Sequence, residues 1–215
     1  MIRTTLIASA ALAATLAAVV PALADSCSAC TKTKTSFVSA EAKAVVGQPA
    51  PDFKLMDQAG NAVSLSDFKG KIVVLEQFND QCPFVKKFYK NGDMNQMAAD
   101  LKAKGVVWLA IDSSNFSSVE ENAAIAAEWN IDRPILDDHA GTVGKQYTAK
   151  TTPHMFVIDQ EGILAYAGAI DSIPSTDAND IAQADNYVAM AVDALLNGET
   201  VSPAETKPYG CSVKF

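Results

Sequence analysis

A single cysteine, Cys82, stands where the segment NDQCPFVKKFY passes from an apolar stretch into a helical pattern. A cysteine at the start of a helix meets unpaired backbone N–H groups and the positive end of the helix dipole, which favour the thiolate. Pro83 suits the first helical position, and Lys86 and Lys87 add positive charge nearby. Because the thiolate is the nucleophile of disulfide exchange and of peroxide attack, Cys82 is our candidate nucleophile. An inert buried cysteine, the alternative, would fit better inside the apolar run KIVVLEQF.

The partner of Cys82 is not its neighbour in sequence. The other cysteines are Cys211, on a tail punctuated by Pro and Gly, and Cys27 and Cys30, in the segment DSCSAC. Four cysteines permit three complete pairings. We rank Cys82–Cys211 together with Cys27–Cys30 first, because the second pair then stays local. Cys27 and Cys30 remain auxiliary thiols that could instead exchange with Cys82 or form half of a metal site.

The N-terminus has the pattern of a cleaved signal peptide. Arg3 precedes an apolar, Ala-rich run, and Ala22-Leu23-Ala24 is a small-x-small cleavage site. A transmembrane anchor is the weaker interpretation, since the run is short and no basic cluster follows it. We therefore predict a signal peptide over residues 1–24, a mature protein that begins at Asp25, and a location in the periplasm or outside the cell, where disulfides persist.

The remainder of the 215 residues is long enough for one well-cored domain. We divide it into a polar leader, residues 25–45, and a single domain, residues 46–215. The net charge of −8 and the lack of a Lys/Arg cluster argue against nucleic acid and anionic membranes as partners. We assign no cofactor, no resident metal and no membrane anchor after signal cleavage.

The apolar patterns predict an α/β fold. Residues 53–56 and 62–65 predict a hairpin, and residues 71–78, 106–113 and 133–138 predict buried strands. A helical pattern runs from residue 83 to 105, with a break near Asn91-Gly92. Further helices are expected over residues 117–130, 139–149 and 180–196. Residues 154–159 and 163–170 predict a second hairpin. This order predicts a sandwich with a mixed sheet, in which the central strands are parallel and the late hairpin antiparallel.

Four motifs together resemble the thioredoxin-like superfamily: VGQPAPDFKLMDQAGNAVSLSDFKGKIVVLEQF, the Cys-Pro at a helix start, TTPHMFVIDQEGIL and a closing Gly-Cys. The resemblance is to its redoxin branch (alkyl hydroperoxide reductase/thiol-specific antioxidant), and within that to CPFV-type thioredoxin family proteins. It covers Val46 to Phe215 and implies a thioredoxin-like sandwich with an N-terminal β-hairpin extension.

The resemblance also implies roles for individual residues. Pro153 is expected to be cis and to lie beside Cys82, and Thr152 to pair with an extended substrate backbone. Pro83 and Phe84 are expected to contact the substrate. His154 either approaches Cys82 or caps a loop, and His139 is given no role.

The sequence departs from the motifs of better-known relatives. Val85 or Asn79 stands where a second cysteine would complete a Cys-x-x-Cys motif. Ordinary peroxiredoxins carry Pro-x-x-x-Thr-x-x-Cys, whereas Leu75 and Asn79 occupy those positions here. Arg133 is the only arginine after the signal peptide, and nothing in the sequence places it beside Cys82. Peroxidase activity is therefore not implied by the motif.

These observations favour a secreted thiol–disulfide oxidoreductase or thiol-based antioxidant. Cys82 attacks a disulfide or oxidised thiol on a protein or small molecule, Cys211 resolves the intermediate, and a redox partner protein closes the cycle. One alternative is a thiol peroxidase with a Cys82 sulfenic acid. Another is a copper-binding protein with Cys82, Cys211 and His154 as soft ligands. The last is a non-catalytic domain in which a Cys82–Cys211 disulfide is structural.

Overall fold

The structure is a computed structural model that describes residues 42–215. The predicted signal peptide, the cleavage site before Asp25, and Cys27 and Cys30 lie outside the described residues. Within residues 42–215, no helix is both long enough and apolar enough to cross a membrane.

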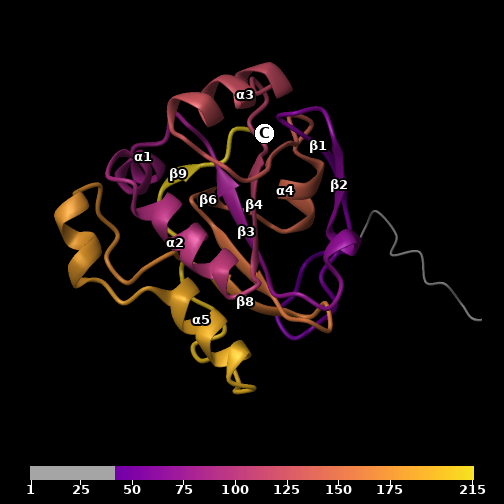
Figure 1. The fold of residues 1–215 in the computed structure, drawn as a ribbon, viewed down its shortest axis with the longest axis vertical. Helices are drawn as coiled ribbons and strands as arrows, with labels where there is room; N and C mark the ends of the chain where they lie inside the picture. The colour runs from indigo at the N-terminus through magenta and orange to yellow at the C-terminus, as the bar shows by residue number, and fades with distance from the viewer. Residues whose placement is uncertain (1–41) are drawn as a thin grey trace, which may run out of the picture. The chain divides into compact units, whose positions relative to one another are not determined.

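A seven-stranded mixed sheet forms the centre of the domain, with the strand order β2-β1-β5-β4-β3-β7-β8 (Figure 1). Strands β3, β4 and β5 are parallel, whereas β7 is antiparallel to β3 and to β8. The predicted parallel centre and late antiparallel hairpin are therefore confirmed, and β1 and β2 form the expected N-terminal hairpin. The strands are β1 (Lys54–Asp57), β2 (Ala62–Ser64), β3 (Val73–Phe78), β4 (Val107–Asp112), β5 (Ile135–Asp137), β7 (Met155–Ile158) and β8 (Leu164–Gly168).

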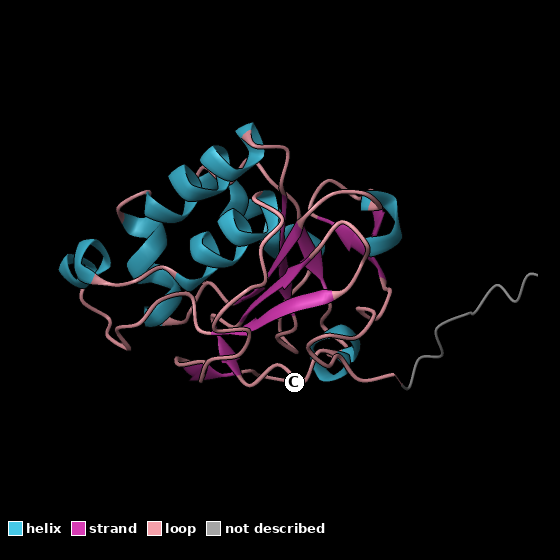
Figure 2. Ribbon diagram, turned by 90° about the horizontal axis from the view of Figure 1, so that it is seen from below, coloured by secondary structure: helices cyan, strands magenta, loops and turns pink. Residues whose placement is uncertain are grey.

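Helices cover both faces of this sheet, and most lie on one side (Figure 2). Val74 of β3 belongs to the core shared with α1, α2, α3 and α5, whereas Val73 and Leu75 belong to the core shared with α4. Every residue of β3 is buried, as expected for a strand covered on both faces. The helices are α1 (Pro83–Lys90), α2 (Asp93–Ala103), α3 (Val119–Glu128), α4 (Thr142–Gln146) and α5 (Tyr187–Leu196), with 3-10 turns η1 (Leu65–Phe68) and η2 (Ala178–Gln183). The predicted thioredoxin-like α/β fold is confirmed.

The helix boundaries follow local capping signals. The break expected near Asn91-Gly92 separates α1 from α2, and Gly92 has a φ of 82°, a conformation that favours glycine. The single helix predicted over residues 180–196 is wrong. It consists of η2 and α5, because the Asn186 side chain accepts a hydrogen bond from the Ala189 N–H and so begins a new helix.

The last part of the chain forms a small second sheet that the sequence did not predict. Strand β9 (Cys211–Ser212) pairs antiparallel with β6 (Thr151–Thr152), and the two lie side by side in Figure 1. We call residues 205–215 the C-terminal segment. Its course brings Cys211 next to the strand that ends at Thr152, directly before Pro153.

Candidate active site

Cys82 lies at the point where β3 gives way to α1. It is the N-cap residue of α1, with Pro83 in the first turn, and its side chain is only 2% exposed. The turn that carries it is held by Asn79, whose side chain accepts a hydrogen bond from the Gln81 N–H and donates one to Ser114 Oγ. Asn79, which stands where a relative would carry a cysteine or threonine, therefore shapes the turn that positions Cys82.

The strand before Pro153 lies against the same thiol. Cys82 Sγ is 2.8 Å from the carbonyl oxygen of Thr152, and the Thr152–Pro153 peptide bond is cis, as predicted. Thr152 also pairs directly with Cys211 across the small sheet. Both Cys82 and Cys211 are free thiols, one buried and one half-buried. The fold thus brings together Cys82, Thr152, Pro153 and Cys211, which are distant in sequence.

The two thiols differ in acidity. Burial acts to raise the pKa of Cys82, but hydrogen bonds from the Thr152 side chain, from the backbone and thiol of Cys211, and from the Val85 N–H outweigh it and lower the pKa. Burial, the hydrogen bond to Cys82 and the charge on Cys82 together raise the pKa of Cys211 to about 11, against a small opposing effect of Lys214. The Thr152 carbonyl oxygen accepts a hydrogen bond from the Cys82 thiol and so favours its protonated form. The several donors that stabilise the thiolate outweigh this single acceptor. Cys82 is therefore the thiol of the pair that ionises first.

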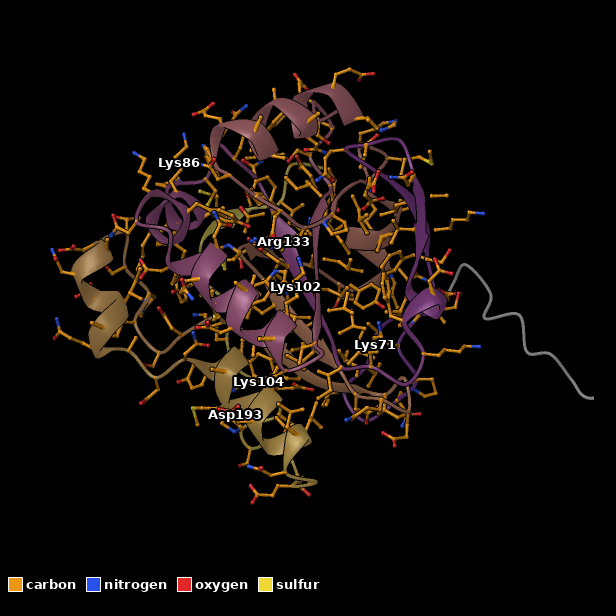
Figure 3. The ribbon with its side chains drawn as sticks, viewed as in Figure 1. Lys71, Lys86, Lys102, Lys104, Arg133 and Asp193 are labelled. Carbon is orange, nitrogen blue, oxygen red and sulfur yellow. The ribbon has the colours of Figure 1, made fainter. Side chains whose placement is uncertain are left out.

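The two lysines expected to stabilise the thiolate act elsewhere. Lys86 projects outward from α1 (Figure 3), where its charge acts on the carboxyl group of Asp80. The Lys87 side chain is fully buried, and its Nζ lies 3.6 Å from Asp171 Oδ2. The main causes that lower the pKa of Cys82 are hydrogen bonds rather than these two lysines, and Lys87 is paired with Asp171.

The buried pair of Lys87 and Asp171 connects α1 to the C-terminal segment. Asp171 accepts a hydrogen bond from the Tyr209 hydroxyl, and Tyr209 is two residues before Cys211. The Phe84 ring meets the Tyr209 ring edge-on, with centroids 5.8 Å apart. Phe84, predicted to contact substrate, is therefore partly covered by the chain's own C-terminal segment, whereas Pro83 is exposed.

The remaining candidates have partners other than the thiols. His154 accepts a hydrogen bond at Nδ1 from the Lys150 N–H, and burial, with the charge of Lys150, lowers its pKa to about 3. It is thus a neutral loop cap rather than a neighbour that could act on Cys82. Arg133 is buried beside Glu76 and donates to Tyr89, so it belongs to a separate network. Residues 42–215 hold no group of three or more His, Cys, Asp or Glu side chains arranged to bind a metal.

A pocket of about 670 Å³ opens beside Cys82. Several of the residues that line it were not predicted from the sequence. They belong to the loop after β4 and to the C-terminal segment, which are far from Cys82 in the sequence. Its lining comprises Asn79, Gln81, Cys82, Asn115, Phe116, Cys211, Ser212, Val213, Lys214 and Phe215. The amide groups and the two phenyl rings give the pocket both polar and apolar walls.

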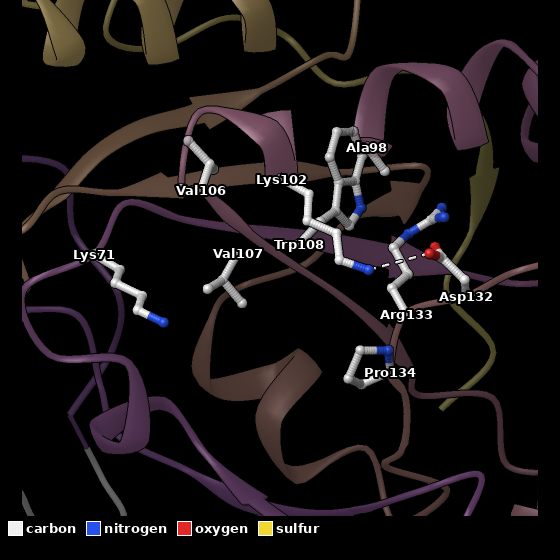
Figure 4. Close-up of a pocket in the computed structure, with 10 residues that line it drawn as sticks. Lys71, Ala98, Lys102, Val106, Val107, Trp108, Asp132, Arg133 and Pro134 are labelled. Carbon is white, nitrogen blue, oxygen red and sulfur yellow. Dashed lines mark hydrogen bonds and ion pairs between the residues drawn. The ribbon is translucent and has the colours of Figure 1, made fainter. Parts of the chain in front are cut away.

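A second pocket, of about 290 Å³, contains neither thiol (Figure 4). Lys71, Lys102 and Arg133 border it, and Lys102 forms an ion pair with Asp132 at 3.1 Å. It lies over the edges of α2 and β4, whereas Cys82 lies at the opposite, carboxyl end of β3. Of these two pockets, only the first is therefore lined by Cys82 and Cys211.

Comparison with known proteins identifies relatives of this chain. Residues 46–167 match the model of the AhpC/TSA family. The thiol-disulfide oxidoreductase ResA of Bacillus cereus is 30% identical over 126 residues, which cover 59% of this chain and 70% of that protein. A Synechocystis protein whose name assigns it provisionally to the peroxiredoxins is 30% identical over 137 residues, 57% of this chain and 67% of that protein.

A crystal structure of an uncharacterized conserved protein from Geobacillus kaustophilus has a similar fold. Its TM-score is 0.66 and its sequence identity 32%, over 80% of this chain and 92% of that one. The family match ends at residue 167, so Cys211 and the C-terminal segment lie beyond it.

Proposed function

The chain belongs to the AhpC/TSA family and is a thiol-dependent oxidoreductase, and on that premise we propose that Cys82 and Cys211 are its redox pair. The observation that carries the proposal is the direct pairing of Cys211 with Thr152, the residue whose carbonyl oxygen contacts Cys82 Sγ. Cys82 is the attacking thiol, and Cys211 supplies the second thiol that a Cys-x-x-Cys motif would otherwise provide.

The exchange proceeds in two displacements. The Cys82 thiolate attacks one sulfur of a substrate disulfide, so that a bond to that sulfur forms while the substrate S–S bond breaks and one thiolate leaves. Cys211 then loses its proton to the departing thiolate or to solvent and attacks Cys82 Sγ, which releases the second substrate thiolate. Two electrons pass from the two cysteines to the substrate, and the protein is left with a Cys82–Cys211 disulfide. A dithiol donor reverses these steps to restore the reduced enzyme.

The electrostatics of the pair set the order of the two displacements. In the reduced protein, the Cys82 thiolate and its hydrogen bond help to raise the pKa of Cys211, so Cys211 stays protonated. Once Cys82 is part of a mixed disulfide, its charge is gone and those two causes disappear. The pKa of Cys211 then falls, with Lys214 assisting, and the resolving thiol becomes more nucleophilic when it is needed.

Two cysteine variants test the pair. Cys82→Ser is expected to abolish disulfide exchange, whereas Cys211→Ser is expected to accumulate a mixed disulfide at Cys82 that peptide mass spectrometry locates. If Cys82→Ser retains full activity, Cys82 is not the nucleophile. If Cys211→Ser releases substrate as quickly as the parent protein, resolution passes to Cys27, Cys30 or another protein. A purely structural disulfide would have a reduction potential below about −300 mV, so the measured potential distinguishes that alternative.

Peroxide reduction through a Cys82 sulfenic acid is the second candidate function. The Synechocystis relative favours it, because its name places it with the peroxiredoxins. Against it, Asn79 is committed to Ser114 and Gln81, and Arg133 to Glu76 and Tyr89, so neither is positioned to hold a peroxide at Cys82. Consumption of hydrogen peroxide by the reduced protein, compared with its Cys82→Ser variant, measures this activity.

The site of action we propose is the periplasm or the cell exterior. The signal-like pattern of residues 1–24 supports this location. There the enzyme would exchange with disulfides or thiols and be served by a redox partner protein, without a bound cofactor. N-terminal sequencing of the protein from its native host tests the location, since a chain that begins at Met1 would contradict it.

A further inference from the structure

The C-terminal segment occupies the edge of the active site at which an extended peptide would bind. An extended partner adds to a sheet by pairing with an exposed edge strand. At this site the edge is β6, whose Thr152 carbonyl contacts Cys82, and β9 already pairs with it antiparallel through Thr152 and Cys211. The chain itself therefore supplies the strand at this edge, and Cys82 is only 2% exposed.

The contact between the segment and β6 leaves no room for a side chain at Gly210. A Cβ atom built there would overlap the Thr152 carbonyl oxygen, and Gly210 has a φ of 131°. Both the close approach and the backbone conformation require glycine. The segment is therefore fitted to β6, rather than resting loosely on it.

The segment is also anchored before the contact with β6. Thr206 Oγ1 accepts a hydrogen bond from the Ala169 N–H at 2.9 Å, and the Thr206 N–H donates to the Ala167 carbonyl. Further along, the Tyr209 hydroxyl donates to Asp171. These contacts fix the approach of the chain to Cys211.

Anchors on the other side of Cys211 complete the attachment. The Asn115 N–H donates to the Lys214 carbonyl at 2.7 Å, and the Val213 N–H donates to the Lys150 carbonyl. With both sides held, a polypeptide substrate would have to displace several hydrogen bonds before it could pair with β6. A small substrate has another route, because the 670 Å³ pocket reaches Cys82 between Asn79, Phe116 and Phe215.

We propose that the C-terminal segment is an internal occupant of the peptide-binding edge, so that Cys82 exchanges with low-molecular-weight disulfides in preference to protein disulfides. The inference rests on the proposed exchange reaction and names its substrate class. In the first step, the Cys82 thiolate bonds to one sulfur of a small disulfide and the other sulfur leaves as a thiolate. The Cys211 thiol gives its proton to that thiolate and bonds to Cys82 Sγ, which releases the second small thiolate to take a proton from solvent. One small disulfide is thus reduced to two thiols while Cys82 and Cys211 are oxidised to a disulfide.

Gly210→Ala tests the proposal, because the added methyl group must push the segment away from Thr152. The matched control is Gly198→Ala, since Gly198 also has a positive φ, of 71°, but has nothing within 4 Å of an added Cβ. All rates are measured on the full chain in a Cys211→Ser background, so that only attack by Cys82 is followed. The probes are bis(2-hydroxyethyl) disulfide and insulin, and the adduct at Cys82 is located by peptide mass spectrometry after an acid quench.

In the parent and Gly198→Ala proteins, we expect Cys82 to react with the small disulfide and only slowly with insulin. Gly210→Ala should raise the rate with insulin by about tenfold, as for the loss of one or two backbone hydrogen bonds, and change the small-disulfide rate little. If Gly210→Ala does not fold, Tyr209→Phe replaces it. That variant removes the hydrogen bond to Asp171 and should also raise the rate with insulin. Equal insulin rates in parent and loosened proteins would overturn the proposal. If neither probe forms an adduct at Cys82, the proposed function itself fails.

Discussion

Replacing Asp171 by asparagine should destabilise the protein strongly, because it removes one partner of a buried ion pair. The side chains of Lys87 and Asp171 are 0% and 3% exposed, and their charged atoms are 3.6 Å apart. The Asp171→Asn substitution would leave the Lys87 ammonium group in the interior without a counter-charge, and it would weaken the hydrogen bond that Tyr209 donates. The variant therefore affects both the core beside α1 and the C-terminal segment.

The expected size of the effect follows from the geometry. Removal of one partner from a buried ion pair costs about 3–5 kcal/mol. Within residues 42–215, neither Lys87 Nζ nor Asp171 Oδ2 has a hydrogen-bond partner, so we expect the lower end, about 3 kcal/mol. Asp193→Asn is the matched control, since it breaks the ion pair between Lys104 and Asp193 (Figure 3). The charged atoms of that pair are closer together, at 2.8 Å, but the side chains of Lys104 and Asp193 are 47% and 56% exposed. An exposed pair contributes about 0.2–1 kcal/mol, so burial and not distance should decide the ranking.

Urea unfolding of the reduced proteins at neutral pH measures both effects as changes in the free energy of unfolding. The free energy of unfolding of each variant should depend on urea concentration with the same slope as in the parent protein, so that the urea midpoints can be compared directly. The reasoning is refuted if Asp171→Asn costs no more than Asp193→Asn. Tyr209→Phe separates the two contributions, because it removes the hydrogen bond to Asp171 but keeps the ion pair with Lys87.

Three further predictions concern titration. Iodoacetamide should alkylate Cys82 with a pH dependence whose midpoint lies below that of an ordinary cysteine, because the pKa of Cys82 is lowered. Cys211→Ala should raise this midpoint, because it removes the thiol that donates a hydrogen bond to Cys82. Thr152→Val should raise it too, since the Thr152 side chain stabilises the thiolate; an unchanged midpoint would contradict that role. Burial, opposed by hydrogen bonds from Ser114, raises the pKa of Asp112 from 3.8 to about 6, so the folded state binds this proton more tightly and loses stability as the pH rises through that interval. Asp112→Asn should flatten the dependence of the urea midpoint on pH between those values.

The local parts of the fold were predictable because their signals are local. Continuous apolar runs, typical of strands that are buried on both faces, indicated the strands before and after Cys82 in the sequence. Gly92 marked the break between α1 and α2, and Ser118 caps α3 by accepting a hydrogen bond from the Glu121 N–H. The boundary of α5 was missed because helical periodicity continues through Asp185, and only the cap formed by Asn186 shows where the helix begins.

The surroundings of the thiols were predictable only in part. A resemblance to known motifs placed Pro153 beside Cys82, and the cis bond agrees with it. The burial of Lys87 could not be foreseen, because its partner Asp171 is 84 positions away and no periodic pattern links them. The pairing of Thr152 with Cys211 is equally non-local. The closest sequence signal was Gly210 directly before Cys211, since a glycine next to a reactive cysteine suggests a close backbone approach.

The separation of the two thiols onto different elements has a consequence for the chemistry. In a Cys-x-x-Cys motif both thiols belong to one helix start, so their spacing is fixed. Here Cys82 is on α1 and Cys211 is on β9, and the hydrogen bonds from Cys211 that lower the pKa of Cys82 exist only while β9 is paired with β6. Displacement of β9 would therefore expose Cys82 and remove these hydrogen bonds in a single step. A substrate small enough to reach Cys82 while the C-terminal segment stays in place would meet the thiol with the hydrogen bonds from Cys211 intact, whereas a larger substrate that displaces β9 would not.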